Sequence, residues 1–173
     1  VGITPAQLYS TASYISRDLT GIKLIDSSFP AIDLTSQNLT SADFSGTFLD
    51  SATLAGASFT AAVIGTASLT STDLTSTQLY SSASYQNRLM PSISLAGNNM
   101  PGWSFASVNL RSAFLPGANL QSANFTSADL HSAALAASNL TSANLTAADL
   151  TRGNLLSANL TATNLTRANL FSA

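Results

Sequence analysis

A large apolar residue returns at every fifth position along most of this chain. In "ANFTSADLHSAALAASNLTSANLTAADL", from Ala123 to Leu150, small or polar residues separate the large ones. This spacing is neither the 3.6-residue period of an α-helix nor the two-residue period of a plain strand. The five-residue period must therefore define the fold itself.

The large residues form two arrays that differ by one residue in phase. The first runs from Leu19 to Leu79 and the second from Leu95 to Leu170. Ala is preferred two residues before each large residue, Asn or Asp one residue before it, and Thr one residue after it. Residues i and i−2 of an extended chain face the same side, so each five sends one large and one small side chain inward. The turn-forming Asn, Asp and Thr residues then bend the chain at fixed intervals, which winds it into the stacked coils of a β-solenoid.

The motif Ala-(Asp/Asn)-Leu-X-X, as in "SANLT", "SADLH" and "AADLT", resembles the pentapeptide-repeat family from about Arg17 to Ala173. The resemblance implies an all-β fold, a right-handed quadrilateral β-helix with one pentapeptide on each side and four in each coil. The twenty-nine large residues then imply about seven coils. The residues expected to point to the axis include Leu110, Leu120, Phe125, Leu130, Leu140, Leu150 and Leu160.

Two near copies of one segment, "TPAQLYSTASY" at 4–14 and "TSTQLYSSASY" at 75–85, divide the chain into two modules. Thr followed by Pro at the start of the first copy signals a helix, and the open first coil of a solenoid needs a cap. We therefore expect four segments: an N-terminal capping helix in 1–16, a first repeat array at 17–79, an interruption at 80–94 and a second array at 95–173. The internal copy is a helical excursion with the tube continuing beneath it, a second cap that splits two tubes, or a functional loop.

The chain stops at "ANLFSA", partway into a repeat, without a capping helix. Either the sequence is truncated or the last coil stacks on a partner that covers its open strand edge. The simplest such partner is a second copy of the chain, so a homodimer through the open C-terminal coil is one expected assembly. Any other protein or surface partner is unknown.

Residues that could carry catalysis are few. His131 is the only histidine, it lies at an outward position, and the sequence has no Cys and no Glu to form a dyad with it. Asp129 and Asp149 should stack one above the other, either as a cation site or, as we favour, as two solvated carboxylates in an Asn and Asp ladder. No zinc or iron ligand set and no Gly-rich phosphate loop are present. We expect no catalytic residue, no cofactor and no bound metal.

The charge pattern argues against nucleic-acid partners. Charged residues make up 8% of the chain, and six Lys and Arg are interspersed among eight Asp. A nucleic-acid footprint needs clustered cations, and the DNA mimicry by which some family members inhibit topoisomerases needs a strongly negative face. No apolar run approaches the roughly 18 residues that span a bilayer.

Outward Thr residues fall one coil apart, at Thr126, Thr146 and Thr166 and, on the next side, at Thr141 and Thr161. Stacked at ~4.8 Å, they would make a flat hydroxyl-and-methyl surface that resembles the ice-binding faces of some antifreeze proteins. An ice- or polysaccharide-binding surface is therefore one hypothesis. The alternative explanation is that Thr suits strands and keeps an uncharged surface wet.

The sequence favours a non-enzymatic structural or protein-interaction solenoid. An ice- or polysaccharide-binding surface and a DNA-mimic topoisomerase inhibitor are the alternatives, and the low acidic content disfavours the second. The "LYSTASY" segment at 8–14 resembles one that precedes the pentapeptide arrays of secreted bacterial proteins. This resemblance implies an extracellular or cell-surface location.

Overall fold

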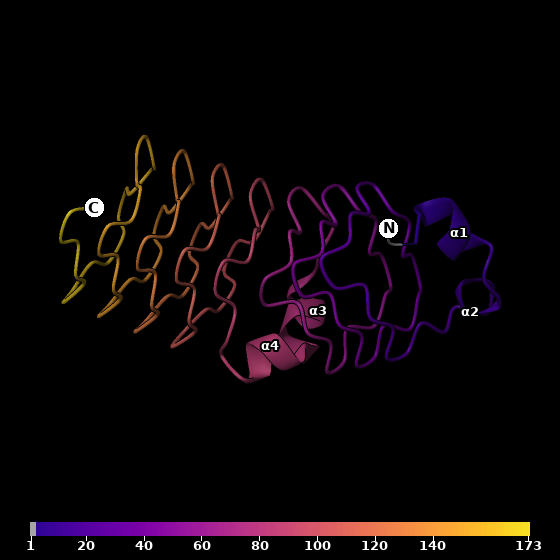
Figure 1. Ribbon diagram of the computed structural model, residues 1–173. Helices are drawn as coiled ribbons and strands as arrows, with labels where there is room; N and C mark the ends of the chain where they lie inside the picture. Colours follow the sequence, from indigo (N-terminus) through magenta and orange to yellow (C-terminus); the bar gives the residue numbers. More distant parts are fainter. Residues whose placement is uncertain (1–2) are drawn as a thin grey trace. The chain divides into compact units, whose positions relative to one another are not determined.

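The computed structural model describes residues 3–173, which form two compact units that divide between Asn87 and Arg88. Within each unit the chain winds through successive similar loops, visible as a row of repeated outlines (Figure 1). Isolated parallel β-bridges join residues twenty apart, as between Asp43 and Val63 or between Asn124 and Asn144. Twenty residues are four pentapeptides, so a four-sided coil is the repeating unit of the predicted β-helix. The number of coils stays a prediction.

Each pentapeptide of the second unit uses its backbone groups in the same way. The N–H of Ala143 donates to the carbonyl of Leu140 across a corner at 2.9 Å. The next N–H, of Asn144, donates to the carbonyl of Ala123 in the preceding coil at 2.9 Å, and the N–H of Leu145 pairs with the following coil. The short extended pieces therefore form single ladder rungs, and no longer strand is present among residues 3–173.

The chain bends at the two residues that follow each large residue, one step later than the sequence pattern suggested. The second of them has a positive φ, such as 58° at both Ser122 and Ser142. This left-handed conformation disfavours bulky side chains, which explains why Ser, Ala and Gly occupy it so often. An added Cβ at Gly46 would collide with the side-chain carboxylate of Asp26, which would have to move. The Asn and Asp residues that directly precede the large residues lie in the extended pieces and not at the bend.

The core of each unit consists of the large residues and the small residues two positions before them. Among the residues expected on the axis, most are completely buried: Leu110, Leu120, Phe125, Leu130, Leu140 and Leu150. Leu160 is only half-buried, because it belongs to the last described coil and no further coil packs on it.

Residues 4–16 form two short helices, α1 (Pro5–Tyr9) and α2 (Ala12–Ile15), in place of the single helix expected. The Thr4 hydroxyl accepts the N–H of Gln7, and the Gln7 side chain accepts the N–H of Thr4, which closes a capping box on α1. Thr11 has extended dihedrals and caps α2, so the chain breaks between the two helices.

The internal copy likewise forms two helices, α3 (Ser76–Ser81) and α4 (Ala83–Gln86). The expected boundary of the first array at 79 is therefore too late, since Leu79 is a buried residue of α3 rather than a repeat centre. The repeat ladder of the second unit begins at Leu89, earlier than the expected 95.

The α3 and α4 helices pack on the last coil of the first array. The Gln78 side chain donates to the carbonyl of Leu54 at 2.6 Å, and the N–H of Ala83 donates to the carbonyl of Ala62 at 2.9 Å. The N–H of Ala83 therefore takes the place of a next coil as the partner of the Ala62 carbonyl, whereas the Leu54 carbonyl also accepts the N–H of Ala57 within its own corner. The copy therefore covers the last coil of the first array, and its three interpretations, a helical excursion, a second cap or a functional loop, stay predictions.

None of the helices in the described part of the chain is both long and apolar enough to cross a membrane.

Candidate functional site

The second unit presents columns of Asn and Asp on its outer faces. These residues precede the large core residues, and the bridges stack each of them on its equivalent in the next coil. Three of the four sides carry such a column: Asn99, Asn119, Asn139 and Asn159; Asn124, Asn144 and Asn164; and Asn109, Asp129, Asp149 and Asn169. The fourth side is mixed, with Ser94, Phe114, Ala134 and Asn154.

Side-chain amides also pair along a column. The Asn119 amide nitrogen donates to the amide oxygen of Asn99 at 2.7 Å, and that of Asn139 donates to Asn119 at 3.2 Å. Such amide ladders add hydrogen bonds along the stacking direction. The sequence pattern predicted an Asn and Asp ladder at Asp129 and Asp149, but it did not predict these hydrogen bonds between side-chain amides.

Each Thr of the predicted ladder donates two hydrogen bonds to the Asn two residues before it, an arrangement that we call a clasp. The Thr126 hydroxyl donates to the Asn124 amide oxygen at 2.7 Å, and the Thr126 N–H donates to the same oxygen at 3.0 Å. The same pair of bonds recurs at the other four predicted ladder residues, Thr141, Thr146, Thr161 and Thr166. The clasp fixes the Thr side chain and uses its hydroxyl proton internally.

The Thr residues stack in the predicted register, but they lie at the corners of the coils. The N–H of Ser127 donates to the Thr146 carbonyl at 2.9 Å, which stacks the coils of Thr126 and Thr146. The Thr residues, however, begin the corner turns instead of lying on flat sides. The prediction that these Thr residues form a flat surface is therefore wrong. The extended sides of the coil carry Asn and Asp, and the Thr residues lie at the corners between the sides.

The two stacked aspartates of the second unit have partners of their own. Arg111 forms an ion pair with Asp129, with 3.2 Å between guanidinium nitrogen and carboxylate oxygen. Hydrogen bonds from the Thr151 hydroxyl and N–H lower the pKa of Asp149. His131 is half-buried, and its backbone N–H donates to the Asp129 carboxylate at 3.1 Å. Residues 3–173 contain no group of three or more potential metal ligands.

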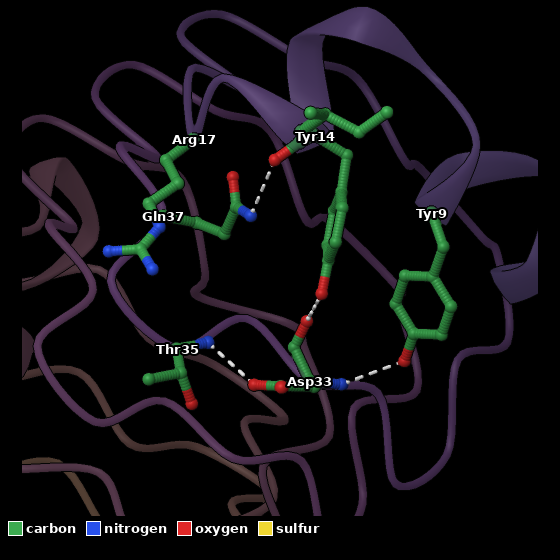
Figure 2. Close-up of a pocket in the computed structure, with 7 residues that line it drawn as sticks. Tyr9, Tyr14, Arg17, Asp33, Thr35 and Gln37 are labelled. Atoms are coloured by element: carbon green, nitrogen blue, oxygen red, sulfur yellow. Dashed lines mark hydrogen bonds between the residues drawn. The ribbon is translucent and has the colours of Figure 1, made fainter.

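A pocket of about 290 Å³ lies beside α1 and α2 in the first unit (Figure 2). Two helices and the first repeats supply its walls. Its lining residues are Tyr9, Tyr14, Ile15, Arg17, Asp33, Thr35 and Gln37.

Two tyrosines fix the backbone of Asp33 at this pocket. The Tyr14 hydroxyl donates to the Asp33 carbonyl at 2.7 Å, and the Asp33 N–H donates to the Tyr9 hydroxyl at 2.9 Å (Figure 2). The two rings lie 4.8 Å apart between centroids. Burial and the nearby Asp33 carboxylate raise the pKa of Tyr14, whereas hydrogen bonds from Thr35 lower the pKa of Asp33. The Asp33 side chain is therefore a carboxylate at neutral pH, held at the wall of the pocket.

Gln37 is the unusual member of the pocket. It occupies an inward position that Ala usually takes, and only 3% of its surface is exposed. Its amide nitrogen donates to the Tyr14 carbonyl at 3.1 Å, while its amide oxygen has no hydrogen-bond partner among residues 3–173. Sequence reasoning missed this site, although a polar residue at an inward position was the available signal.

The family model for pentapeptide repeats matches in eight copies at residues 18–56, 104–141 and 138–173, which together make up more than half of the chain. The chain belongs to the pentapeptide-repeat family. This membership confirms the resemblance seen in the repeated motif, and it implies the right-handed four-sided β-helix with which the twenty-residue ladder agrees. No curated protein matches the chain.

Solved pentapeptide-repeat structures resemble this chain. HetL of the cyanobacterium Nostoc sp. strain PCC 7120, involved in heterocyst differentiation regulation, is 29% identical over 88% of this chain and 65% of its own, with a TM-score of 0.48. A protein of the Arabidopsis thaliana thylakoid lumen is 31% identical over 42% of this chain and 53% of its own, with a TM-score of 0.29. The chain thus spans less than two thirds of either protein.

A third structure covers more of both chains. Trypsin-treated QnrB1, a plasmid-mediated fluoroquinolone resistance protein, is 17% identical over 86% of this chain and 85% of its own, with a TM-score of 0.51. At this identity the likeness concerns the fold alone.

Proposed function

We propose that this pentapeptide-repeat protein is a non-enzymatic interaction module that binds a partner protein through the outer columns of its second unit. The observation that carries the proposal is the repeated clasp between Asn and Thr, as between Asn144 and Thr146. It holds outward side chains in one conformation before any partner arrives. Because ordering side chains costs free energy on association, a surface that is already ordered binds with less loss.

The composition of this surface supports a partner of low charge. The columns consist mainly of amides and hydroxyls, and the ion pair of Arg111 with Asp129 leaves little net charge on the charged side. Amides present both donors and acceptors, which suits a polar protein surface. The low charge also gives no support to a DNA-mimic topoisomerase inhibitor, since that role needs a continuous negative face.

Photo-cross-linking tests the proposed surface. A photoreactive amino acid replaces Asn164 on a column, and in a matched variant it replaces Ala134 on the mixed side. In cells that produce the protein, we expect one discrete cross-linked product from position 164. The additional substitution Asn144→Asp keeps the acceptor for Thr146 but adds a charge to the column, and it should remove this product with little change in the melting temperature. Equal cross-linking from both positions, or no discrete product from either, contradicts the proposal.

We also propose an extracellular or cell-surface location. The support is the resemblance of the "LYSTASY" segment to one found in secreted bacterial proteins. Protease added to intact cells should then degrade the protein while a cytosolic marker survives. Protection of the protein until the cells are lysed would contradict this location.

Ice or crystalline polysaccharide is a second candidate ligand, favoured by the register of Thr126, Thr146 and Thr166. Against it, the clasp consumes each hydroxyl proton, and the residues line a corner. The candidate predicts thermal hysteresis, or sedimentation with cellulose or chitin, that Thr146→Lys abolishes. If neither activity is found, it is excluded.

A homodimer through the last coil remains a proposal about assembly. Leu156 and Phe171 of this coil are 73% and 72% exposed, so a partner would bury apolar surface. Light scattering on this chain and on a form extended by two further coils tests it. A dimer that becomes a monomer on extension supports pairing through the open coil, whereas a monomer in both contradicts it.

A further inference from the structure

The pocket beside α1 and α2 has the features of a built ligand site. We infer that it binds a neutral, hydroxyl-rich small ligand of about the size of one sugar unit. The site is separate from the outer columns of the second unit, so this inference stands independently of the proposed function.

The first argument is the buried amide oxygen of Gln37, which has no partner among residues 3–173. Leaving a buried acceptor unpaired costs about 1–3 kcal/mol. Other inward polar residues of the described chain avoid this cost, since the Thr47 hydroxyl donates to the Leu24 carbonyl at 2.6 Å and the Ser138 hydroxyl to the Leu135 carbonyl at 2.7 Å. The Gln37 amide nitrogen is already bonded to a carbonyl, so the group still missing is a hydrogen-bond donor.

The second argument comes from the internal sequence copy, which lies seventy-one residues further on. It keeps Tyr80, Tyr85 and Arg88 at the positions of Tyr9, Tyr14 and Arg17. At the positions of Asp33, Thr35 and Gln37, however, it has Ser104, Ala106 and Val108. The duplicated segment therefore does not require the polar trio in order to form two helices. Asp33, Thr35 and Gln37 are therefore specific to the first unit, as expected for residues that bind a ligand there.

The chemistry of the walls defines the ligand. Asp33 and Gln37 present acceptors, while Arg17 and the Tyr9 hydroxyl present protons that no acceptor among residues 3–173 takes up. The positive charge of Arg17 and the negative charge of Asp33 cancel, so the pocket favours a neutral ligand. Hydroxyl groups donate and accept at once, and two tyrosine rings offer a face for C–H groups.

Size and access agree with a single sugar ring. A volume of about 290 Å³ lies at the lower end of the range of small-molecule pockets. Arg17 is exposed and makes no ion pair with any residue of the described chain, so its side chain can move to admit a ligand group to the Gln37 oxygen. Figure 2 shows the Arg17 side chain beside Gln37, with its guanidinium on the side away from Tyr14 in this view.

Titration calorimetry and NMR on the full chain test the inference, with glucose, galactose, mannose and N-acetylglucosamine as probes. Cello- and chito-oligosaccharides distinguish a free sugar from the end of a glycan, since a glycan site binds the oligosaccharide at least as tightly as its unit. We expect one-to-one binding of at least one probe, with shifts confined to the pocket residues. Methylammonium and acetate serve as charged probes and should bind more weakly.

The variants are chosen to keep the fold. Gln37→Val introduces the residue of the internal copy and removes the acceptor. Arg17→Ser places the commonest corner residue at a position with φ of 60° and removes the donor, and Arg167→Ser, at a corner with φ of 59° in the other unit, is its matched control.

Gln37→Val and Arg17→Ser should each weaken sugar binding about tenfold, which corresponds to the loss of one hydrogen bond. Arg167→Ser should leave it unchanged, and all three variants should keep the parent melting temperature within a few degrees. The inference is overturned if no probe binds, if a charged probe binds more tightly than every sugar, or if folded Arg17→Ser binds like the parent. Should Gln37→Val fail to fold, Arg17→Ser alone decides the question.

Discussion

The Thr146 hydroxyl and the Thr146 N–H both donate to the amide oxygen of Asn144, at 2.6 Å and 3.0 Å. The other four N–H groups of this pentapeptide donate to backbone carbonyls. Asn144 therefore supplies the acceptor for the remaining one, the N–H of Thr146. This explains why Asn or Asp precedes so many of the large residues. It also ties the outer surface to the stability of the coil.

Asn144→Ala removes that acceptor, and we expect it to lower the free energy of unfolding by about 1–2 kcal/mol, as for the loss of a helix cap. Asn144→Asp keeps the oxygen and should cost much less. The urea midpoint of each variant gives the comparison. Equal loss in both variants would mean that the clasp contributes nothing.

Leu140→Lys places a charged group on the axis of the second unit, where Leu140 has no exposed surface. An unpaired ammonium in an apolar core is strongly unfavourable, so the variant should lose its cooperative unfolding transition in circular dichroism. Leu160→Lys is the matched control. Leu160 is half-buried, so its replacement can extend to water and should leave the rest of the unit folded. A melt of Leu140→Lys like that of the parent would contradict the axial position of this residue.

The five-residue period was sufficient to predict the core, because a large residue on each side of a coil leaves a direct mark in the sequence. The position of Leu140 on the axis followed from that mark. The bend was harder to predict, since Ser142 and its equivalents have a left-handed φ that Ser rarely adopts and that ladder bonds impose. The segment at 4–16 was expected as one helix, and the extended dihedrals of Thr11 divide it.

The candidate sites were less visible in the sequence. The Thr register at Thr126 and Thr146 was predicted, but the clasp to Asn depends on where each corner begins, which the period does not specify. The pocket brings Tyr9 and Tyr14 of the two helices together with Asp33 and Gln37 of the first repeats. No local sequence pattern predicts that these residues lie together. The only indication of the pocket was a polar residue, Gln37, at an inward position.

Ser142→Val tests the left-handed corner. A β-branched residue at φ of 58° is disfavoured, and we expect a loss of about 1–2 kcal/mol in the free energy of unfolding. Ser142→Gly has no such penalty and should be as stable as the parent within about 1 kcal/mol. Calorimetric melting temperatures would separate the two. A valine variant as stable as the glycine variant would contradict the corner geometry.

Acid should weaken the second unit through Asp149. Hydrogen bonds from the Thr151 hydroxyl and then from its N–H lower the pKa of Asp149 below that of an unfolded Asp. The carboxylate therefore stabilises the fold above the unfolded pKa of about 3.9, and this contribution is lost as the pH falls through the lower folded value.

Asp149→Asn keeps an acceptor at this position without a titrating group. Urea midpoints measured between pH 6 and pH 2 should fall less in this variant than in the parent. Parallel curves for the two proteins would show that Asp149 does not contribute to acid sensitivity.

Amide hydrogen exchange by NMR tests the central claim most directly, because the claim is a coil of four pentapeptides whose backbone and Asn side chains hold a preformed outer surface. For the amides of residues 109–150 we predict slow exchange except at Ala136, because Ala134 two residues before it offers no side-chain acceptor. In Asn144→Ala, Thr146 alone should become fast among the amides of its pentapeptide. Fast exchange along the repeats of the parent, or loss of protection across the whole unit in Asn144→Ala, would contradict this account.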